Sequence, residues 1–245
     1  MKYFSLIVIM TFGVLTANAQ KPKDNQMAGY IIMADGTRSE VGLEVEDASQ
    51  PWTYQDGVKY FDKNLLTGGR IKRELKKVLM AGEVVEYGFG NKKYVHIHYL
   101  PKTKGSDAIK TTMDKIKGEK NMEFFAEVIR DGDIRLLRFY QPPIITDEDY
   151  DNPESIAEMT KESIETYDIL IDKVGEKAKS IEEINYKSFF EGCSFVTKKF
   201  EDKRYKIQPS SGIKKLLKSD SLSGIRLENA ANAILDDYQQ KCGKK

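Results

Sequence analysis

The sequence predicts an α+β fold in which an antiparallel β-sheet, or a partly closed barrel, is followed by a C-terminal helical segment. Three observations support this prediction. β-prone runs separated by Gly-containing turns fill the chain from Gln26 to Gln141, as expected for a sheet built from hairpins. Near the C-terminus, apolar residues recur every three or four positions, which is the period of an amphipathic helix. Because the strands come first and the helices later, the order indicates α+β rather than a βαβ repeat.

Residues 1–19 have the layout of a secretory signal peptide. Lys2 precedes an apolar run at residues 3–15, and Ala17 and Ala19 are small residues at the positions that a signal peptidase reads. The run is short for a membrane span, which takes about 20 residues. We therefore expect cleavage after Ala19, export to the periplasm or the extracellular space, and no transmembrane segment afterwards. A buried N-terminal helix or a retained anchor is the alternative.

Residues 20–145 are expected to form a β-rich region with seven or eight strands. Ala34-Asp35-Gly36-Thr37 lies between two β-prone runs, and its Asp-Gly pair suits the positive backbone angles of a type I′ turn. Asp56-Gly57 precedes another β-prone run. A later hairpin is expected to turn at Asp131-Gly132-Asp133.

A stretch punctuated by glycines at residues 76–100 predicts three consecutive strands. Ala81-Gly82 and Gly90-Asn91 divide the stretch, and glycine favours tight turns because it adopts positive φ without steric cost. We expect the three strands to pair in sequence order, as a meander. Residues 106–117 are compatible with a short helix.

Residues 146–245 are expected to contain an acidic loop, a hairpin and helices that complete the same domain. The hairpin covers residues 167–181 with Gly175 at its turn. Two apolar stripes at helical spacing follow, and a shorter helix is expected after Ser210-Ser211 because serine is a favourable N-cap. The stripes consist of Tyr186, Phe189, Phe190, Cys193, Val196 and Phe200, and of Leu227, Ala231, Ile234, Leu235, Tyr238 and Cys242.

The two cysteines, Cys193 and Cys242, each lie on one of these stripes. Packing of the two helices by their stripes would bring the thiols together, and an oxidising compartment lets a disulfide persist. The cross-link would contribute roughly 3–4 kcal/mol by restricting the unfolded chain. Two buried free thiols or a catalytic cysteine are the alternatives, although catalysis needs a nearby base and both histidines lie far upstream.

Three sequence features of the chain also occur together in other proteins. They are the signal-peptide layout, an early Gly-Tyr-Ile-Ile hairpin with Asp-Gly-Thr, and a late helical segment between two cysteines. In the late segment, an aromatic pair precedes the first cysteine, a Lys and a Tyr follow it, and an aliphatic residue and a Tyr precede the second cysteine. These residues are Phe189, Phe190, Cys193, Lys199, Tyr205, Ile234, Tyr238 and Cys242. In this combination the chain resembles a group of uncharacterised small exported proteins of Bacteroidota. That group often has an acidic residue and a proline around its first cysteine, where this chain has Gly192 and Ser194. The resemblance implies an exported β-rich domain with a helical tail, and it implies no catalytic residues.

An acidic run of the sequence has the spacing of a calcium-binding loop. Calcium prefers about six to eight oxygen ligands, and an EF-hand loop supplies them at alternate positions and at a final glutamate. The candidate ligands are Asp147, Asp149, Asp151, Ser155 and Glu158. Two departures weaken the match: Asn152 replaces the usual glycine, and the preceding stretch reads as a strand rather than a helix. A solvated acidic loop leading into a helix is the alternative.

Two histidines, His96 and His98, are separated by one residue in a predicted strand. Alternate residues of a strand share one face, so a metal ion such as zinc could bridge them. Val95, Ile97 and Tyr99 would then occupy the opposite, buried face. We expect the histidines to face solvent, and any carboxylate ligand would have to come from elsewhere in the chain.

Composition and motifs narrow the classes of function. Lys and Arg total 39 against 38 for Asp and Glu, so the basic excess typical of nucleic-acid-binding domains is missing. The sequence has neither the G-x-S-x-G motif of many hydrolases nor the P-loop motif of nucleotide-binding proteins. No catalytic residue is therefore assigned.

Aromatic residues offer one further binding candidate. Trp52 and Tyr54 lie in a predicted loop, where exposed rings are often used for ligand binding. The alternative is that they cover one edge of the β core. We therefore expect an exported, non-catalytic binding or envelope-associated protein of unknown ligand. A hydrolase acting on envelope or extracellular polymers and a calcium-stabilised module are the alternatives, and no cofactor other than calcium is indicated.

Overall fold

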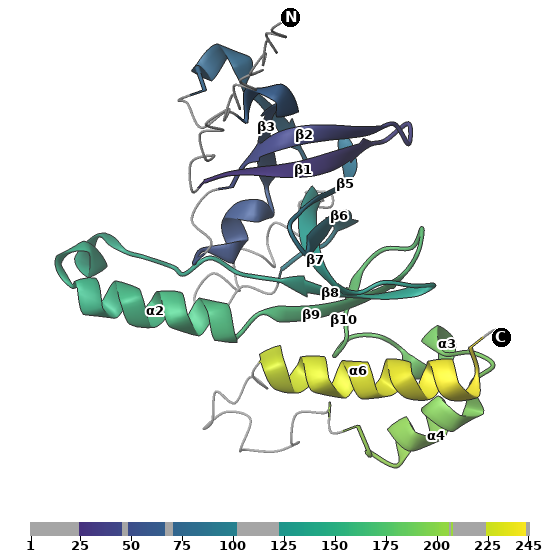
Figure 1. Cartoon of the computed structure of the whole chain (residues 1–245). Helices are drawn as coiled ribbons and strands as arrows, with labels where there is room; N and C mark the ends of the chain where they lie inside the picture. The colour runs from purple at the N-terminus through teal and green to yellow at the C-terminus, as the bar shows by residue number, and fades with distance from the viewer. Residues whose placement is uncertain are drawn as a thin grey trace, which may run out of the picture.

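The chain forms one ten-stranded sheet with helices packed against one end of it (Figure 1). The computed structural model describes residues 25–45, 49–66, 71–101, 123–205, 207 and 224–243. Residues 1–19, the predicted helix at residues 106–117 and the one after Ser210-Ser211 lie outside this described part. Within it, no helix is long and apolar enough to cross a membrane.

Every pair of neighbouring strands in the sheet is antiparallel. The strands are β1 (Gln26–Met33), β2 (Arg38–Glu44), β3 (Gly57–Asp62), β4 (Lys77–Met80), β5 (Val84–Phe89), β6 (Lys92–His98), β7 (Glu123–Arg130), β8 (Ile134–Phe139), β9 (Asp168–Lys173) and β10 (Lys179–Ser180). Their spatial order is β10-β9-β8-β7-β6-β5-β1-β2-β3-β4. The α+β prediction is confirmed, and the sheet is open rather than partly closed.

The β-rich region and the C-terminal region share this sheet. β8 pairs along its whole length with β9, from Ile134 opposite Lys173 to Phe139 opposite Asp168. β9 and β10 form the predicted hairpin, and Gly175 has a φ of 90° at its turn. A positive φ of this kind is readily adopted only by glycine.

The pairing of β4 and β5 differs from the expected meander. All three predicted strands form, but β5 pairs with β1, and β4 pairs with β3 at the edge of the sheet. The chain therefore crosses from the edge to the centre of the sheet at Ala81-Gly82. A local glycine signal marks where a strand ends, whereas the partner of a strand depends on contacts distant in sequence.

The first hairpin also turns differently from the prediction. The Gly36 N–H donates to the Met33 carbonyl (2.9 Å), and the Met33 N–H donates to the Thr37 carbonyl (3.0 Å). Gly36 has a φ of 83°, whereas Asp35 is not at positive φ. The loop is thus a three-residue connection with glycine in the left-handed position, not a type I′ turn, which needs two positive φ values.

The helices are α2 (Pro153–Glu165), α3 (Tyr186–Phe189), α4 (Ser194–Glu201) and α6 (Gly224–Lys241), with short 3-10 segments η1 (Pro51–Tyr54), η2 (Lys63–Leu65), η3 (Arg73–Leu75) and η4 (Asp147–Asp151). The first apolar stripe forms two helices instead of one, because the chain turns at Gly192 with a φ of 85°. The C-terminal helix is confirmed as α6. Figure 1 shows α3, α4 and α6 gathered beside β8–β10.

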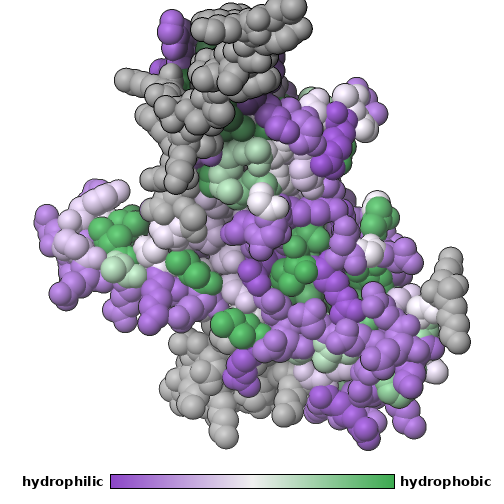
Figure 2. Space-filling model, in the orientation of Figure 1, coloured by the Kyte–Doolittle hydropathy of each residue, from purple (hydrophilic) through white to green (hydrophobic). Residues whose placement is uncertain are grey.

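Helix α6 packs on the sheet through its apolar face and through ion pairs. Leu227, Ala231, Ile234 and Leu235 are buried against residues of β8 and β9. Arg138 of β8 pairs with Glu228 at 2.7 Å, and Arg130 of β7 pairs with Asp236 at 2.7 Å. On the face shown in Figure 2, the surface of this helical layer is mostly hydrophilic, and exposed hydrophobic residues occur in small groups.

The predicted disulfide is confirmed. Cys193 and Cys242 are bonded, with a Cα–Cα distance of 5.6 Å and a sequence separation of 49. The bond joins the start of α4 to the residue following α6. Both cysteines are taken up by this bond, so neither offers a free thiol.

Candidate metal centre

His96 and His98 lie on the face of β6 that also carries Tyr94. Tyr94 is 1% exposed and belongs to an aromatic core cluster, so this face is not the solvent face that we expected. The His96 side chain is 16% exposed and that of His98 is 38% exposed. The imidazole rings lie with their centroids 4.8 Å apart at an interplanar angle of 68°. Both histidines thus sit at the margin of the core, partly shielded from water.

Strand β7 supplies the carboxylate that the sequence did not identify. His98 lies directly opposite Glu123 in the β6–β7 register, and His96 lies opposite Phe125. Cross-strand neighbours on one face hold their side chains close together. His96 Nε2 is 3.9 Å from Glu123 Oε1, and His98 Nδ1 is 3.8 Å from the same oxygen. All three donor atoms lie within 4.8 Å of one another.

The two imidazole nitrogens that face Glu123 are buried and have no hydrogen-bond partner among the described residues. Their distances to the carboxylate exceed the usual hydrogen-bond range. Burial lowers the pKa of His96, the neighbouring His98 lowers it further, and Glu123 opposes both effects. His96 is therefore neutral at neutral pH, with a lone pair available. Leaving buried polar atoms unsatisfied costs free energy, and a bound cation would remove that cost.

The turn between β4 and β5 leaves room for the Glu123 carboxylate. A Cβ atom at Gly82 would lie 2.4 Å from Glu123 Oε2, which is closer than real contacts allow. Gly82 also has a φ of 102°, which other residues rarely adopt. The absence of a side chain at Gly82 lets the carboxylate lie between the backbone of this turn and the two histidines.

Hydrogen bonds fix the beginning of β7 beside the site. The Phe125 N–H donates to the Gln55 carbonyl (2.6 Å), and the Gln55 side chain pairs with the backbone of Tyr140. Phe125 is fully buried and meets Tyr87 edge to face at 4.8 Å. Glu123 precedes this anchored residue by two positions, so its backbone is held in place before any ligand binds.

Two imidazoles and one carboxylate suit zinc and neighbouring divalent transition metals better than calcium or magnesium, which favour oxygen ligands. Metal–ligand bonds of about 2.0–2.1 Å place tetrahedral donors roughly 3.3–3.4 Å apart. Each histidine nitrogen would therefore have to move about half an ångström closer to Glu123 Oε1, and the two nitrogens, which lie within 4.8 Å of each other, would have to approach by up to about 1.4 Å. Side-chain rotation provides movements of this size. Within the described ranges, no other set of three His, Cys, Asp or Glu donors lies this close together.

The acidic run forms helix-start contacts. Asp149 accepts hydrogen bonds from the Thr146 N–H (2.8 Å), the Thr146 hydroxyl (2.7 Å) and the Ser155 hydroxyl (3.3 Å). The bonds from Thr146 hold the pKa of Asp149 below its ordinary value. Asn152 accepts from the Ser155 N–H and caps α2. The other candidate ligands, Asp147, Asp151 and Glu158, lie in η4 and α2. Calcium binding at this run stays a prediction, and the ion would compete with these hydrogen bonds.

The two aromatic candidates occupy different environments. Tyr54 is 4% exposed in the aromatic core, and its carbonyl accepts a hydrogen bond from the Tyr87 hydroxyl. Its placement favours the alternative in which it covers the core. Trp52 is only partly buried, against the cluster beneath α6. A ligand-binding role for Trp52 stays a prediction.

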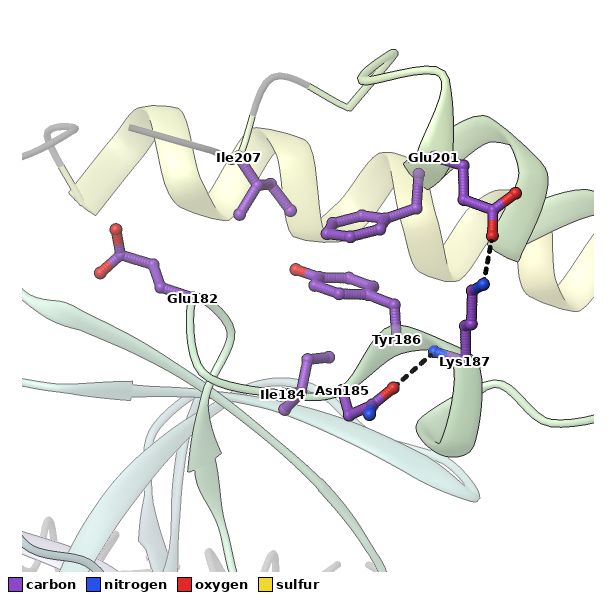
Figure 3. Close-up of a pocket in the computed structure, with 8 residues that line it drawn as sticks. Glu182, Ile184, Asn185, Tyr186, Lys187, Glu201 and Ile207 are labelled. Atoms are coloured by element: carbon purple, nitrogen blue, oxygen red, sulfur yellow. Dashed lines mark hydrogen bonds and ion pairs between the residues drawn. The ribbon is translucent and has the colours of Figure 1, made fainter. Parts of the chain in front are cut away.

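A solvent-accessible pocket of about 410 Å³ lies between α3, α4 and the segment after β10 (Figure 3). Tyr186 and Phe200 stack inside it at 3.5 Å, and the Lys187–Glu201 ion pair (2.7 Å) crosses one side. Figure 3 shows Glu182 on the opposite side from this pair. Lys187, the one lysine among the described lining residues, is thus already paired with a carboxylate, so the histidine site is the stronger candidate.

Comparisons with known proteins assign neither a family nor a function to the chain. No protein-family profile matches the chain, and no curated protein or solved structure matches it. The resemblance to exported proteins of Bacteroidota therefore stays a prediction, and function has to be argued from the geometry of the site.

Proposed function

We propose that this chain is an exported binding protein whose ligand is a divalent transition-metal ion held by His96, His98 and Glu123. One observation carries the proposal: three donor atoms of suitable type lie within 4.8 Å of one another on two paired strands. Two of these atoms are buried nitrogens that have no hydrogen-bond partner in the described part of the chain. Leaving these buried nitrogens without hydrogen bonds destabilises the metal-free site, and a bound metal ion would remove this destabilisation.

Export is supported by the signal-peptide layout at residues 1–19 and by the Cys193–Cys242 disulfide. Disulfides persist mainly in oxidising compartments outside the cytoplasm. An envelope location would place the metal site where the protein meets metal ions from the surroundings. No assigned catalytic residue is needed for this role.

Isothermal titration calorimetry of the chain, purified without a histidine tag, tests metal binding. We expect one Zn²⁺ or Co²⁺ ion per chain and no comparable signal with Ca²⁺. Loss of a group supporting a ligand usually lowers metal affinity about 10–100-fold, so His96→Ala or His98→Ala should lower it by more than this. Glu123→Gln should also weaken binding.

Glu176→Gln is the matched control for Glu123→Gln, because Glu176 is an exposed residue of the β9–β10 turn. Circular dichroism of each variant shows whether it remains folded. Wild-type protein that binds no transition metal, or folded histidine variants that bind it with unchanged affinity, would contradict the proposal.

A further inference from the structure

We infer that the metal ion at His96, His98 and Glu123 keeps one coordination position for an exogenous small anion. This inference rests on the proposed metal-binding function and extends it to the class of ligand that completes the site.

All three protein donors approach from the same surface. They belong to adjacent strands β6 and β7, and they project from one face of the sheet. Donors that share a face occupy one side of a metal ion, so the side away from the sheet has no ligand from these strands. In the described part of the chain, no fourth His, Cys, Asp or Glu joins the group. Metal sites with three protein ligands characteristically complete their coordination with water or substrate.

The exposed fraction of the donor side chains increases from His96 through His98 to Glu123. The His96 side chain is 16% exposed, His98 is 38% exposed and Glu123 is 45% exposed. The Gly82 turn packs against Oε2 of the carboxylate, so solvent reaches the metal from the remaining side of His98 and Glu123. A small molecule can therefore enter without rearrangement of the aromatic core behind His96.

The charge of the loaded site selects an anion. Two neutral imidazoles and one carboxylate leave a divalent ion with a formal charge of +1. Partial burial weakens the screening of this charge by water, so an anionic ligand gains more than a neutral one. The ligand has to be small, because the donor side chains are only partly exposed, from 16% at His96 to 45% at Glu123.

Visible absorption of the Co²⁺-loaded protein tests the inference. Co²⁺ absorption in the visible range depends on the number and type of ligands, so it reports ligand exchange directly. Azide and thiocyanate serve as probes, each titrated into the same tag-free chain at a fixed Co²⁺ content. We expect a saturable shift of the visible bands with one anion bound per metal ion.

The controls separate the two proposals. A Co²⁺ spectrum that is unchanged at saturating azide would show a closed coordination sphere and overturn the inference, while metal binding itself would stand. Failure of Co²⁺ to bind in calorimetry would overturn the proposed function. The His96→Ala/His98→Ala variant should show no azide response; if its response matched that of the wild type, the anion would be binding cobalt elsewhere and the inference would fall.

Discussion

The side-chain amide of Gln55 forms two hydrogen bonds with the backbone of Tyr140. Its Nε2 donates to the Tyr140 carbonyl, and its Oε1 accepts from the Tyr140 N–H, both at 2.6 Å. The backbone carbonyl of Gln55 accepts from the Phe125 N–H on β7. One buried residue after η1 thus bridges the beginning of β7 and the residue following β8, and it substitutes for strand pairing where β7 and β8 diverge.

Replacing Gln55 should therefore destabilise the fold. Gln55→Ala leaves the buried N–H and carbonyl of Tyr140 without partners, and an unsatisfied buried polar group costs about 1–3 kcal/mol. We expect a loss of about 2–4 kcal/mol in the free energy of unfolding, measured by urea denaturation. Gln50→Ala is the matched control, because Gln50 is exposed. Equal stability of the two variants would contradict the bridging role.

Reduction of the disulfide should weaken the helical layer. The Cys193–Cys242 bond closes a segment of 49 residues, and a cross-link of this span is worth roughly 3–4 kcal/mol. We expect the double variant Cys193→Ser/Cys242→Ser to unfold at lower urea than the oxidised wild type. Reductant should lower the midpoint of the wild type and leave that of the double variant unchanged. A midpoint insensitive to reductant in the wild type would argue against a stabilising bond.

Acid should remove the contribution of Asp237 to stability. Burial raises the pKa of Asp237, but hydrogen bonds from Lys199 (2.5 Å) and Tyr205 (2.8 Å) outweigh it and hold the pKa below the ordinary 3.8. A carboxylate with a lowered pKa in the folded state stabilises the protein above its unfolded-state pKa. The contribution is lost as the pH falls through the folded-state pKa.

Urea denaturation at several pH values checks this prediction. Asp237→Asn should be less stable than the wild type near neutral pH, and the difference should shrink as the pH falls below 3.8. Glu176→Gln, at an exposed turn position, should show little difference at either pH. A difference between Asp237→Asn and wild type that is constant with pH would contradict the account.

The calcium alternative makes its own prediction. If Asp147, Asp149 and Asp151 bind calcium, millimolar calcium should raise the melting temperature relative to chelator, because a ligand that binds only the folded state stabilises it. Asp151→Asn should diminish that rise. Identical melting curves with calcium and with chelator would contradict calcium binding and would favour the alternative, a solvated acidic loop that leads into α2.

Strands and helices were predictable because their signals are local. Glycines marked the ends of β7 and β9, and the apolar period placed α6 and both cysteines on packing faces. Gly192 shows the limit of this reasoning: the apolar stripe continues past it, but the chain turns at its positive φ between the end of α3 and the start of α4. The spacing of apolar residues alone does not reveal that a helix is interrupted.

The candidate site was only half predictable. His96 and His98 were visible as a pair two residues apart, whereas Glu123 joins them through the register of β6 and β7, which are separated by a segment of the chain outside the described residues. The sequence offered one indication of Glu123: it is a carboxylate at the start of a β-prone run, Glu-Phe-Phe, that could pair with the strand carrying the histidines. The partner of β5 and the bridge made by Gln55 likewise depend on contacts distant in sequence, which no local pattern encodes.

Nuclear magnetic resonance of the two imidazoles tests the metal site most directly. The chain contains only two histidines, so each ring nitrogen signal can be assigned with one His96→Ala variant. On addition of Zn²⁺, we expect His96 Nε2 and His98 Nδ1 to change together and to reach completion at one ion per chain. No change in either ring, or a change confined to the more exposed His98, would contradict a shared metal site.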